Sequence, residues 1–336
     1  MEPQELSAAA EALLAAAGCA VKPDDIRALS GGGNNRVYRV AAGGQAFALK
    51  AYFTEASDLR DRLGIEFGFL RFAWRIGLRS VPRPLAADAA RRAALYEYVD
   101  GRRTAEADMD AEHVLECAGL FAALNTPAAR SAAGELPDAS DACFSVVQHM
   151  RSVDRRLERL ASISAGGAAD REAAQLVALI AARWQGERAA LLRAMPDAKY
   201  SIDERCVSPS DFGFHNALVR ADGRLCFLDF EYAGWDDPAK MAGDFFWHAG
   251  MRPPRRHFEA FVQAAFAGLI DPQASATRTR MLFPVFRARW ACIALNEFLP
   301  DAMRRRQFAG GAAEDLEARK RVQLQKAQAV YADADS

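Results

Sequence analysis

Asp211, Asn216 and Asp229 are the residues of this sequence whose side chains and spacing best suit chemistry. The short segments on either side of Asp222-Gly223 are strand-like, and Asp-Gly is a strong signal for a two-residue hairpin turn. Counting outwards from that turn predicts that Asn216 faces Asp229. Opposed side chains on one face lie about 5 Å apart, close enough for an amide oxygen and a carboxylate to bind one hard cation.

Asp211 stands five residues before Asn216, at the other end of a short loop. A loop of this length can hold a carboxylate beside a metal ion, where it can orient and deprotonate a substrate hydroxyl. The pattern therefore predicts magnesium-dependent phosphoryl transfer, with Asp211 as the catalytic residue and with Asn216 and Asp229 as metal ligands. The alternative interpretation is an ordinary surface hairpin flanked by turn and strand-end acids.

A second hairpin is predicted near the N-terminus, where a glycine run leads into residues 36–40, followed by Gly43-Gly44 and residues 47–50. With Gly43-Gly44 as the turn, Val37 is opposite Lys50. Alternate residues of a strand point to opposite faces. One face then carries bulky apolar side chains that suit a core: Tyr38, Val40, Phe47 and Leu49. The other face carries Lys50 together with Val37, Arg39 and Ala48.

The second face suits a nucleotide, because Val37 and Ala48 offer small apolar groups to a flat purine base and Lys50 offers a charge to its phosphates. The run Gly31, Gly32 and Gly33 before this hairpin lets backbone N–H groups approach a phosphate without obstruction by Cβ atoms. A plain turn is the alternative interpretation of the glycines.

Two further elements are predicted between this hairpin and residue 100. Apolar residues recur at helical spacing from Glu55 to Ile76, and Glu66 borders the apolar stripe. The segment Ala93–Val99 has the composition of a strand, and it ends at Asp100-Gly101.

The step from Asp211 to Asn216, followed by a metal-binding Asp229, is the catalytic-loop pattern of protein kinases. Residues 208–216 and 228–233 resemble the aminoglycoside phosphotransferase and choline kinase branch of that superfamily. The resemblance implies a bilobal α+β fold. Its N-lobe, residues 1–100, has an antiparallel sheet with one long helix. Its C-lobe, residues 101–336, is mainly helical and carries the catalytic β-hairpin, the metal site and the acceptor pocket.

The same resemblance assigns roles and shows one departure. Residues 47–50 match the kinase strand whose lysine contacts the α- and β-phosphates, which is Lys50 here, and Glu66 is the acid expected to pair with it. The strand that ends near residue 99 would bind the adenine edge through the backbone from Glu97 to Val99. Pro209 stands where the family has a histidine that supports the catalytic loop.

The implied cofactors are ATP and Mg²⁺, and the implied acceptor is a hydroxyl of a small polar metabolite such as a sugar, an amino sugar or an amino alcohol. Two alternatives remain open. One is a catalytically silent kinase-like module that binds a nucleotide or a metabolite, and the other is an aminoglycoside-resistance phosphotransferase.

Composition agrees with this class of protein. A chain of 336 residues is long enough for two lobes, and its net charge of −1 argues against a nucleic-acid partner. Residues 12–21 are too short to span a membrane, and the six cysteines contain no Cys-x-x-Cys pair, so we expect a cytoplasmic protein with reduced thiols. Residues 203–244 contain nine acids and four bases, which favours a cationic or polyhydroxylated acceptor.

Overall fold

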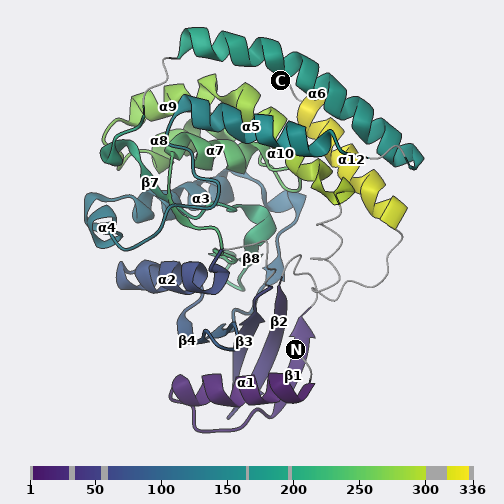
Figure 1. Ribbon diagram of the computed structural model, residues 1–336. Coiled ribbons are helices and arrows are strands. Elements are labelled where there is room, and N and C mark those ends of the chain that lie inside the picture. Colours follow the sequence, from purple (N-terminus) through teal and green to yellow (C-terminus); the bar gives the residue numbers. More distant parts are fainter. Residues whose placement is uncertain are drawn as a thin grey trace. The chain divides into compact units, whose positions relative to one another are not determined.

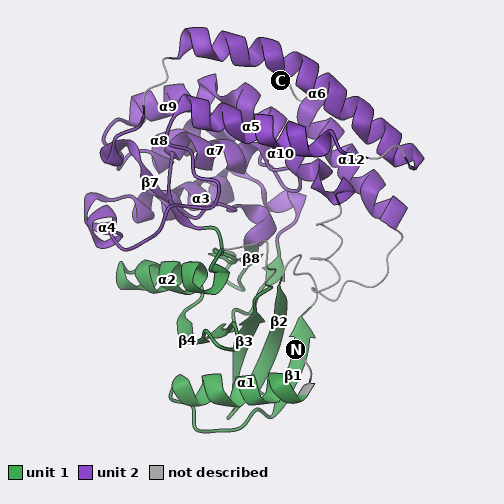
Figure 2. Ribbon diagram, in the orientation of Figure 1, with its two compact units in different colours: residues 1–103, 217–232, 304–312 green, residues 104–216, 233–303, 313–336 purple. Residues whose placement is uncertain are grey.

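The computed structural model describes the chain except for residues 1–2, 30–34, 54–59, 164–165, 196–198, 300–315 and 333–336. It is an α+β protein that divides into two compact units (Figure 2). Unit 1 comprises residues 1–103 and 217–232, and unit 2 comprises residues 104–216, 233–303 and 313–336. The predicted catalytic hairpin thus groups with unit 1, whereas the sequence analysis assigned it to the C-terminal lobe.

Unit 1 is built on an antiparallel sheet with the strand order β1-β2-β3-β5-β4. These strands are β1 (Asp25–Leu29), β2 (Arg36–Ala42), β3 (Gln45–Ala51), β4 (Pro84–Asp88) and β5 (Ala93–Glu97). Helix α1 (Pro3–Ala16) lies against this sheet (Figure 1), and its Leu13 and Leu14 are buried with the predicted core face of the β2–β3 hairpin. Neither α1 nor β1 was predicted from the sequence.

The β2–β3 hairpin confirms the predicted register, because Val37 pairs with Lys50 and Tyr38 pairs with Leu49. Gly43 and Gly44 have φ angles of 56° and 75°. A two-residue turn in which both central residues need positive φ favours glycine, which has no Cβ to clash there. The register is therefore fixed by the turn, and the alternation of apolar side chains then follows.

Helix α2 (Arg62–Arg75) lies within the predicted range Glu55–Ile76. Asp61 caps it by accepting a hydrogen bond from the Gly64 amide at 2.9 Å. Residues 54–59, where the helix was expected to begin, lie outside the described residues. The helix buries Glu66 and Phe69.

The second hairpin forms, but the predicted register is wrong by one residue. Strands β8 (Ala217–Val219) and β9 (Leu225–Phe227) pair with Ala217 opposite Phe227, and β6 (Arg102–Arg103) pairs with the other edge of β8. Arg220 pairs with Arg224 around a three-residue loop that ends at Gly223, with φ of 83°. This is a turn followed by a left-handed glycine, which adds one residue to the connection. Neither Asn216 nor Asp229 belongs to the ladder.

Unit 2 is mainly helical, as predicted. Its helices are α3 (Ala111–Leu124), α4 (Pro127–Ala132), α5 (Val146–Leu160), α6 (Ala168–Ala194), α7 (Pro238–Trp247), α8 (Phe258–Ala265), α9 (Pro272–Met281), α10 (Phe283–Ala294) and α12 (Leu316–Ala332). A large apolar core joins α5, α6, α10 and α12 (Figure 1). Two short strands, β7 (Cys206–Ser208) and β10 (Gly234–Asp236), pair antiparallel beside the segment that contains Asp211.

The described helices include none that is both long and apolar enough to cross a membrane. All six cysteines carry free thiols, and five of them are buried.

Candidate active site

Lys50 is the centre of an ion-pair network within unit 1. Its ammonium donates to Glu66 Oε2 and to Asp229 Oδ1, each at 2.6 Å. Strand β3 supplies the lysine, helix α2 supplies Glu66, and the segment after β9 supplies Asp229. The pairing of Lys50 with Glu66 is the one expected from the family resemblance.

The carboxylates keep Lys50 charged. Burial alone would lower the pKa of Lys50, but Asp229, Glu66 and Glu231 together raise it well above the usual range. The Lys50 side chain is only 9 % exposed, so its ammonium is held by its partners rather than by water. A buried, charged and immobile lysine suits the binding of phosphate oxygens.

Glu66 is held from three sides. Besides Lys50, it accepts hydrogen bonds from the Tyr52 hydroxyl at 2.7 Å and from the Phe230 amide at 3.3 Å. The Phe230 ring stacks on Phe69 of α2, with centroids 4.8 Å apart. These contacts fix the residue after Asp229 against the helix that carries Glu66.

Asp229 has a φ of 66°, in the left-handed region that residues with a side chain rarely adopt. The Asp229 side chain is 39 % exposed. Strained backbone of this kind persists where surrounding contacts determine it, and it is common at functional sites.

Three residues that the sequence analysis did not assign to the site hold the segment after Asp229. Glu231 accepts a hydrogen bond from Arg62 at 2.7 Å and from the Asn35 amide group at 2.6 Å, and all three side chains are buried. Asn35 in turn accepts from the Phe53 amide at 3.0 Å. Because these contacts join segments far apart in the chain, no local spacing in the sequence could have found them.

The remaining predicted nucleotide residues are placed by the sheet of unit 1. Val37 and Ala48 are half-buried on the face opposite the apolar core. The Glu97 amide donates to the Arg83 carbonyl at 2.9 Å, and Val99 follows the end of β5. Gly31, Gly32 and Gly33 lie outside the described residues.

Asp211 and Asn216 belong to unit 2, where the loop between them is tied to itself. The Asn216 amide nitrogen donates to the Asp211 carbonyl at 2.9 Å, and Ser210 has a left-handed φ of 64°. Strand β7 before the loop is held by the buried Asn125, which exchanges two hydrogen bonds with the Val207 backbone at 2.8 and 2.9 Å. Asn125 therefore holds the backbone before the predicted catalytic loop, and the Asn216 side chain ties the two ends of the loop together.

The aromatic residues of this loop anchor it to helix α7. Phe212 and Phe214 are buried, and their rings lie 5.6 and 5.9 Å from that of Phe245. The Thr104 hydroxyl donates to the Phe214 carbonyl. Asp211 and His215 lie directly before and directly after these two apolar anchors, and their side chains are partly exposed.

His215 contacts the Asp211 carboxylate, with its Nε2 atom 3.1 Å from Oδ1. The His215 ring stacks on the His248 ring, with centroids 3.7 Å apart and planes 7° from parallel. Burial raises the pKa of Asp211, but His215 and His248 outweigh this effect and lower it to about 2. Asp211 is therefore ionised at neutral pH.

Asp211, His215 and His248 each offer a potential metal-ligand atom, and these atoms lie within 4.8 Å of one another. The hydrogen bonds argue against a metal at His248. Its Nδ1 atom accepts from the amides of Gly250 and Met251, both at 3.1 Å, so a neutral ring carries its proton on Nε2. A metal on Nε2 would force that proton onto Nδ1, against two N–H groups.

Asn216 in unit 2 and Asp229 in unit 1 each offer an oxygen of the kind that a hard cation prefers. The Asn216 amide nitrogen is engaged with the Asp211 carbonyl, and no hydrogen bond to the amide oxygen is found among the residues that the structure describes. Lys50 contacts Oδ1 of Asp229 and leaves the second carboxylate oxygen, and the side chain is 39 % exposed. Amide and carboxylate oxygens are the ligands that Mg²⁺ prefers.

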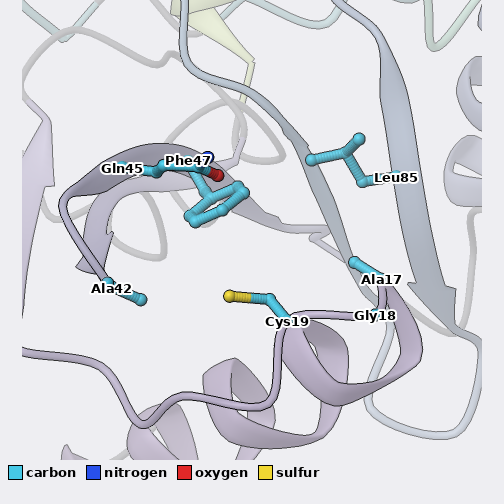
Figure 3. A pocket seen from close by; sticks show the side chains of 8 residues that line it. Ala17, Gly18, Cys19, Ala42, Gln45, Phe47 and Leu85 are labelled. Carbon is cyan, nitrogen blue, oxygen red and sulfur yellow. The ribbon is translucent and has the colours of Figure 1, made fainter.

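A separate cavity of about 390 Å³ lies at the turn end of the β2–β3 hairpin (Figure 3). Its lining includes Cys19, Ala42, Phe47 and Leu85, and Figure 3 shows the Cys19 sulfur directed towards Ala42 beneath the Phe47 ring. None of the lining residues is charged, and none belongs to the predicted site. This cavity is therefore not where we expect phosphate chemistry.

Solved structures that are similar to this chain include kinases and phosphotransferases of small molecules. A choline/ethanolamine kinase family protein from Mesorhizobium loti is similar over 98% of this chain and 95% of its own, with 18% identity and a TM-score of 0.61. A spectinomycin phosphotransferase, APH(9)-Ia, solved with ADP and spectinomycin, is similar over 98% and 99%, with 10% identity and a TM-score of 0.62. A choline kinase from Cryptosporidium parvum is similar over 91% and 89%, with 11% identity and a TM-score of 0.57.

At these identities the structures show a shared kinase-like fold and no more. A comparison with curated proteins finds no match. The model of the phosphotransferase enzyme family (APH), in contrast, matches residues 25–281, which include Lys50, Glu66, Asp211, Asn216 and Asp229. Because this match covers most of the chain, the protein belongs to the phosphotransferase enzyme family.

Proposed function

We propose that this protein is an ATP-dependent kinase that phosphorylates a hydroxyl of a small polar metabolite, such as a sugar, an amino sugar or an amino alcohol. The observation that carries the proposal is the network in which Glu66 and Asp229 hold Lys50 charged within unit 1. A lysine fixed in this way can position the α- and β-phosphates of ATP. Val37, Ala48 and the backbone from Glu97 to Val99 would hold the base, and the loop of Gly31, Gly32 and Gly33 would cover the phosphates.

Asp211 is the proposed catalytic residue. Its pKa of about 2 makes it a weak base, so its main role is to accept a hydrogen bond from the acceptor hydroxyl and to orient it. The hydroxyl becomes strongly acidic only as its oxygen bonds to phosphorus, and Asp211 then receives the proton. Phosphoryl transfer leaves little covalent chemistry to the protein, and orientation accounts for much of its contribution.

Asn216 and Asp229 are the proposed metal ligands. Bound Mg²⁺ would neutralise part of the charge on the ATP phosphates. Asp229 has two roles in this proposal, because Oδ1 holds Lys50 while Oδ2 remains for the cation.

The test is a transfer assay with γ-labelled ATP, Mg²⁺ and a panel of sugars, amino sugars, amino alcohols and aminoglycosides. We expect the wild type to label at least one acceptor. Asp211→Asn should retain ATP binding and lose at least about 1,000-fold in kcat, by analogy with other general-base substitutions. Asp222→Asn is a matched control, because Asp222 is an exposed acid of the β8–β9 turn, and it should turn over like the wild type.

Nucleotide binding without labelling of any acceptor would favour the silent binding module instead. Labelling of aminoglycosides alone would favour the resistance enzyme. Equal turnover of Asp211→Asn and the wild type would refute the catalytic assignment of Asp211.

A further inference from the structure

The carboxylate of Asp211 is held on one side by an imidazole. An ionised carboxylate only accepts hydrogen bonds, so His215 Nε2 carries the proton in the 3.1 Å contact with Asp211 Oδ1. The Asp211 side chain is 37 % exposed, whereas His215 is 17 % exposed. The imidazole is thus the more confined member of the pair, and it limits the rotation of the carboxylate.

His215 is itself confined by His248. The two rings stack in parallel at 3.7 Å, and His248 is fixed by the two amides that donate to its Nδ1 atom. The Trp290 ring meets the His248 ring edge-on, with centroids 4.5 Å apart. The Nε1 atom of Trp290 donates to the buried Asp244 at 2.9 Å. A continuous set of contacts therefore runs from α10 through His248 to the carboxylate of Asp211.

We propose that His215 and His248 are positioning residues that hold the Asp211 carboxylate in the orientation needed by the acceptor hydroxyl. This proposal rests on the proposed kinase function. In the family, a histidine at the position of Pro209 supports the catalytic loop. Here His215, four residues after Asp211, would take over this support through its side-chain contact with Asp211. His248 contributes through stacking rather than through a proton.

The stacking of two imidazoles has a consequence for their charge. Burial and the neighbouring His215 lower the pKa of His248 to about 3, so this ring is neutral at neutral pH. A neutral His248 stacks on His215 without charge repulsion.

The first experiment separates the N–H of His215 from its ring. His215→Phe keeps a ring that can stack on His248 but removes the donor to Asp211, and His215→Gln keeps a side-chain N–H but removes the ring. We expect kcat of His215→Phe to fall by about 10- to 100-fold, because displacement of a catalytic group by about 1 Å costs this much. KM for ATP should stay within about 2-fold, since the nucleotide is assigned to residues of unit 1. His215→Gln should recover part of kcat.

His113→Phe is the matched control. His113 also contacts an aspartate, with Nδ1 3.2 Å from Asp110 Oδ2, at the start of α3. Its replacement should leave kcat unchanged. If His215→Phe matches the wild type, or if His215→Gln and His215→Phe lose kcat equally, the positioning role is refuted.

The second experiment tests His248 without using activity. In ¹⁵N-histidine NMR spectra of the full-length protein we expect His248 to be protonated on Nε2 and not on Nδ1. A proton on Nδ1 of His248 would overturn the proposal. Micromolar Zn²⁺ that inhibits the wild type but not His248→Phe would also overturn it, because that result would show that Asp211, His215 and His248 bind a metal.

Different results would refute the kinase function and the positioning role of His215. A wild type with the expected tautomer that labels no acceptor refutes the kinase function and, with it, the positioning role. A wild type that turns over while His215→Phe equals it refutes the positioning role alone.

Discussion

Glu231 shows how a residue outside the chemistry shapes the candidate site. It lies two residues after Asp229 and is fully buried, where it binds Arg62 and Asn35. Asp229 has a left-handed φ, a conformation that costs of the order of 1–2 kcal/mol for a residue with a side chain. The Glu231 ion pair is one of the contacts that hold this strained segment in place.

Glu231→Gln should therefore destabilise the protein by about 3–5 kcal/mol, because it removes a buried carboxylate from a buried guanidinium. Glu259→Gln is the matched control. Glu259 also binds an arginine, Arg280, at 2.6 Å, but its side chain is 68 % exposed, so the expected loss is about 1 kcal/mol or less. Urea unfolding of both variants measures the difference. Equal losses would show that the buried pair is not a main determinant of stability.

Helix α7 is buried along its whole length, so its packing is sensitive to single atoms. A Cβ atom added at Gly243 would lie 2.2 Å from the buried ring of Phe286 on α10. Gly243→Ala should destabilise the protein by about 1–3 kcal/mol through overpacking. Gly186→Ala in the exposed part of α6 should instead stabilise by about 0.5–1 kcal/mol, because its added Cβ meets no atom within 4 Å beyond its chain neighbours and the nearby backbone of its own helix. Urea unfolding distinguishes the two, and a stabilised Gly243→Ala would contradict the packing of α7 on α10.

The start of α7 is joined to α5 by a buried pair whose strength depends on pH. His149 Nε2 lies 2.9 Å from a carboxylate oxygen of Asp237, the residue that caps α7. Burial lowers the pKa of His149, but the neighbouring Cys143 and Asp237 raise it to about 9, above the usual 6.5. Because folding raises the pKa of His149, the folded state binds this proton more tightly than the unfolded state does. The resulting stabilisation is fully present below pH 6.5 and is lost as the pH rises through 9.

His149→Gln should therefore lower Tm most near pH 6, and the difference from the wild type should shrink towards pH 10. Thermal unfolding of both proteins across this range measures it. A difference that grows with pH would show that His149 is neutral in the folded state.

The two hairpins explain which elements the sequence could predict. Gly43-Gly44 provides two left-handed residues, which fit a two-residue turn, and the observed register is the predicted one. Asp222-Gly223 provides one glycine, which can also end a three-residue loop, and this is what forms. The predicted opposition of Asn216 and Asp229 depended on the shorter turn, and it is not part of the observed ladder.

At the scale of the whole molecule, the family resemblance predicted the fold class and the Lys50–Glu66 pair, because the motifs that carry it occupy short continuous segments. They did not predict α1, whose apolar residues matter only once the sheet exists to receive them. The Arg62–Glu231 contact was also missed, since it links residues 169 positions apart. Long-range contacts of this kind depend on the assembled fold.

The acid excess of residues 203–244 gives less information about the acceptor than we expected. Most of these acids bind cations, several of which lie outside that window: Asp229 with Lys50, Glu231 with Arg62, Asp237 with Arg278, Asp244 with Arg289, and Asp236 with Lys240. The folded chain therefore compensates much of the excess. The count of acids therefore gives no preference for a cationic acceptor, and the acceptor panel tests this point directly.

Nucleotide binding should change the stability of the whole molecule, since a ligand that binds only the folded state stabilises it by an amount set by its concentration relative to Kd. At 100 times Kd this stabilisation is about 2.7 kcal/mol.

We expect ATP with Mg²⁺ to raise Tm of the wild type and of Asp211→Asn alike, because Asp211 is assigned to the acceptor. Asp229→Asn should lose most of this shift, and chelation of Mg²⁺ should reduce it in the wild type. Differential scanning fluorimetry with ATP, with ATP and EDTA, and with Mg²⁺ alone measures each effect. If Asp229→Asn responds to ATP with Mg²⁺ as the wild type does, Asp229 is not a ligand of the metal–nucleotide complex, and the metal assignment fails while the catalytic assignment of Asp211 stands.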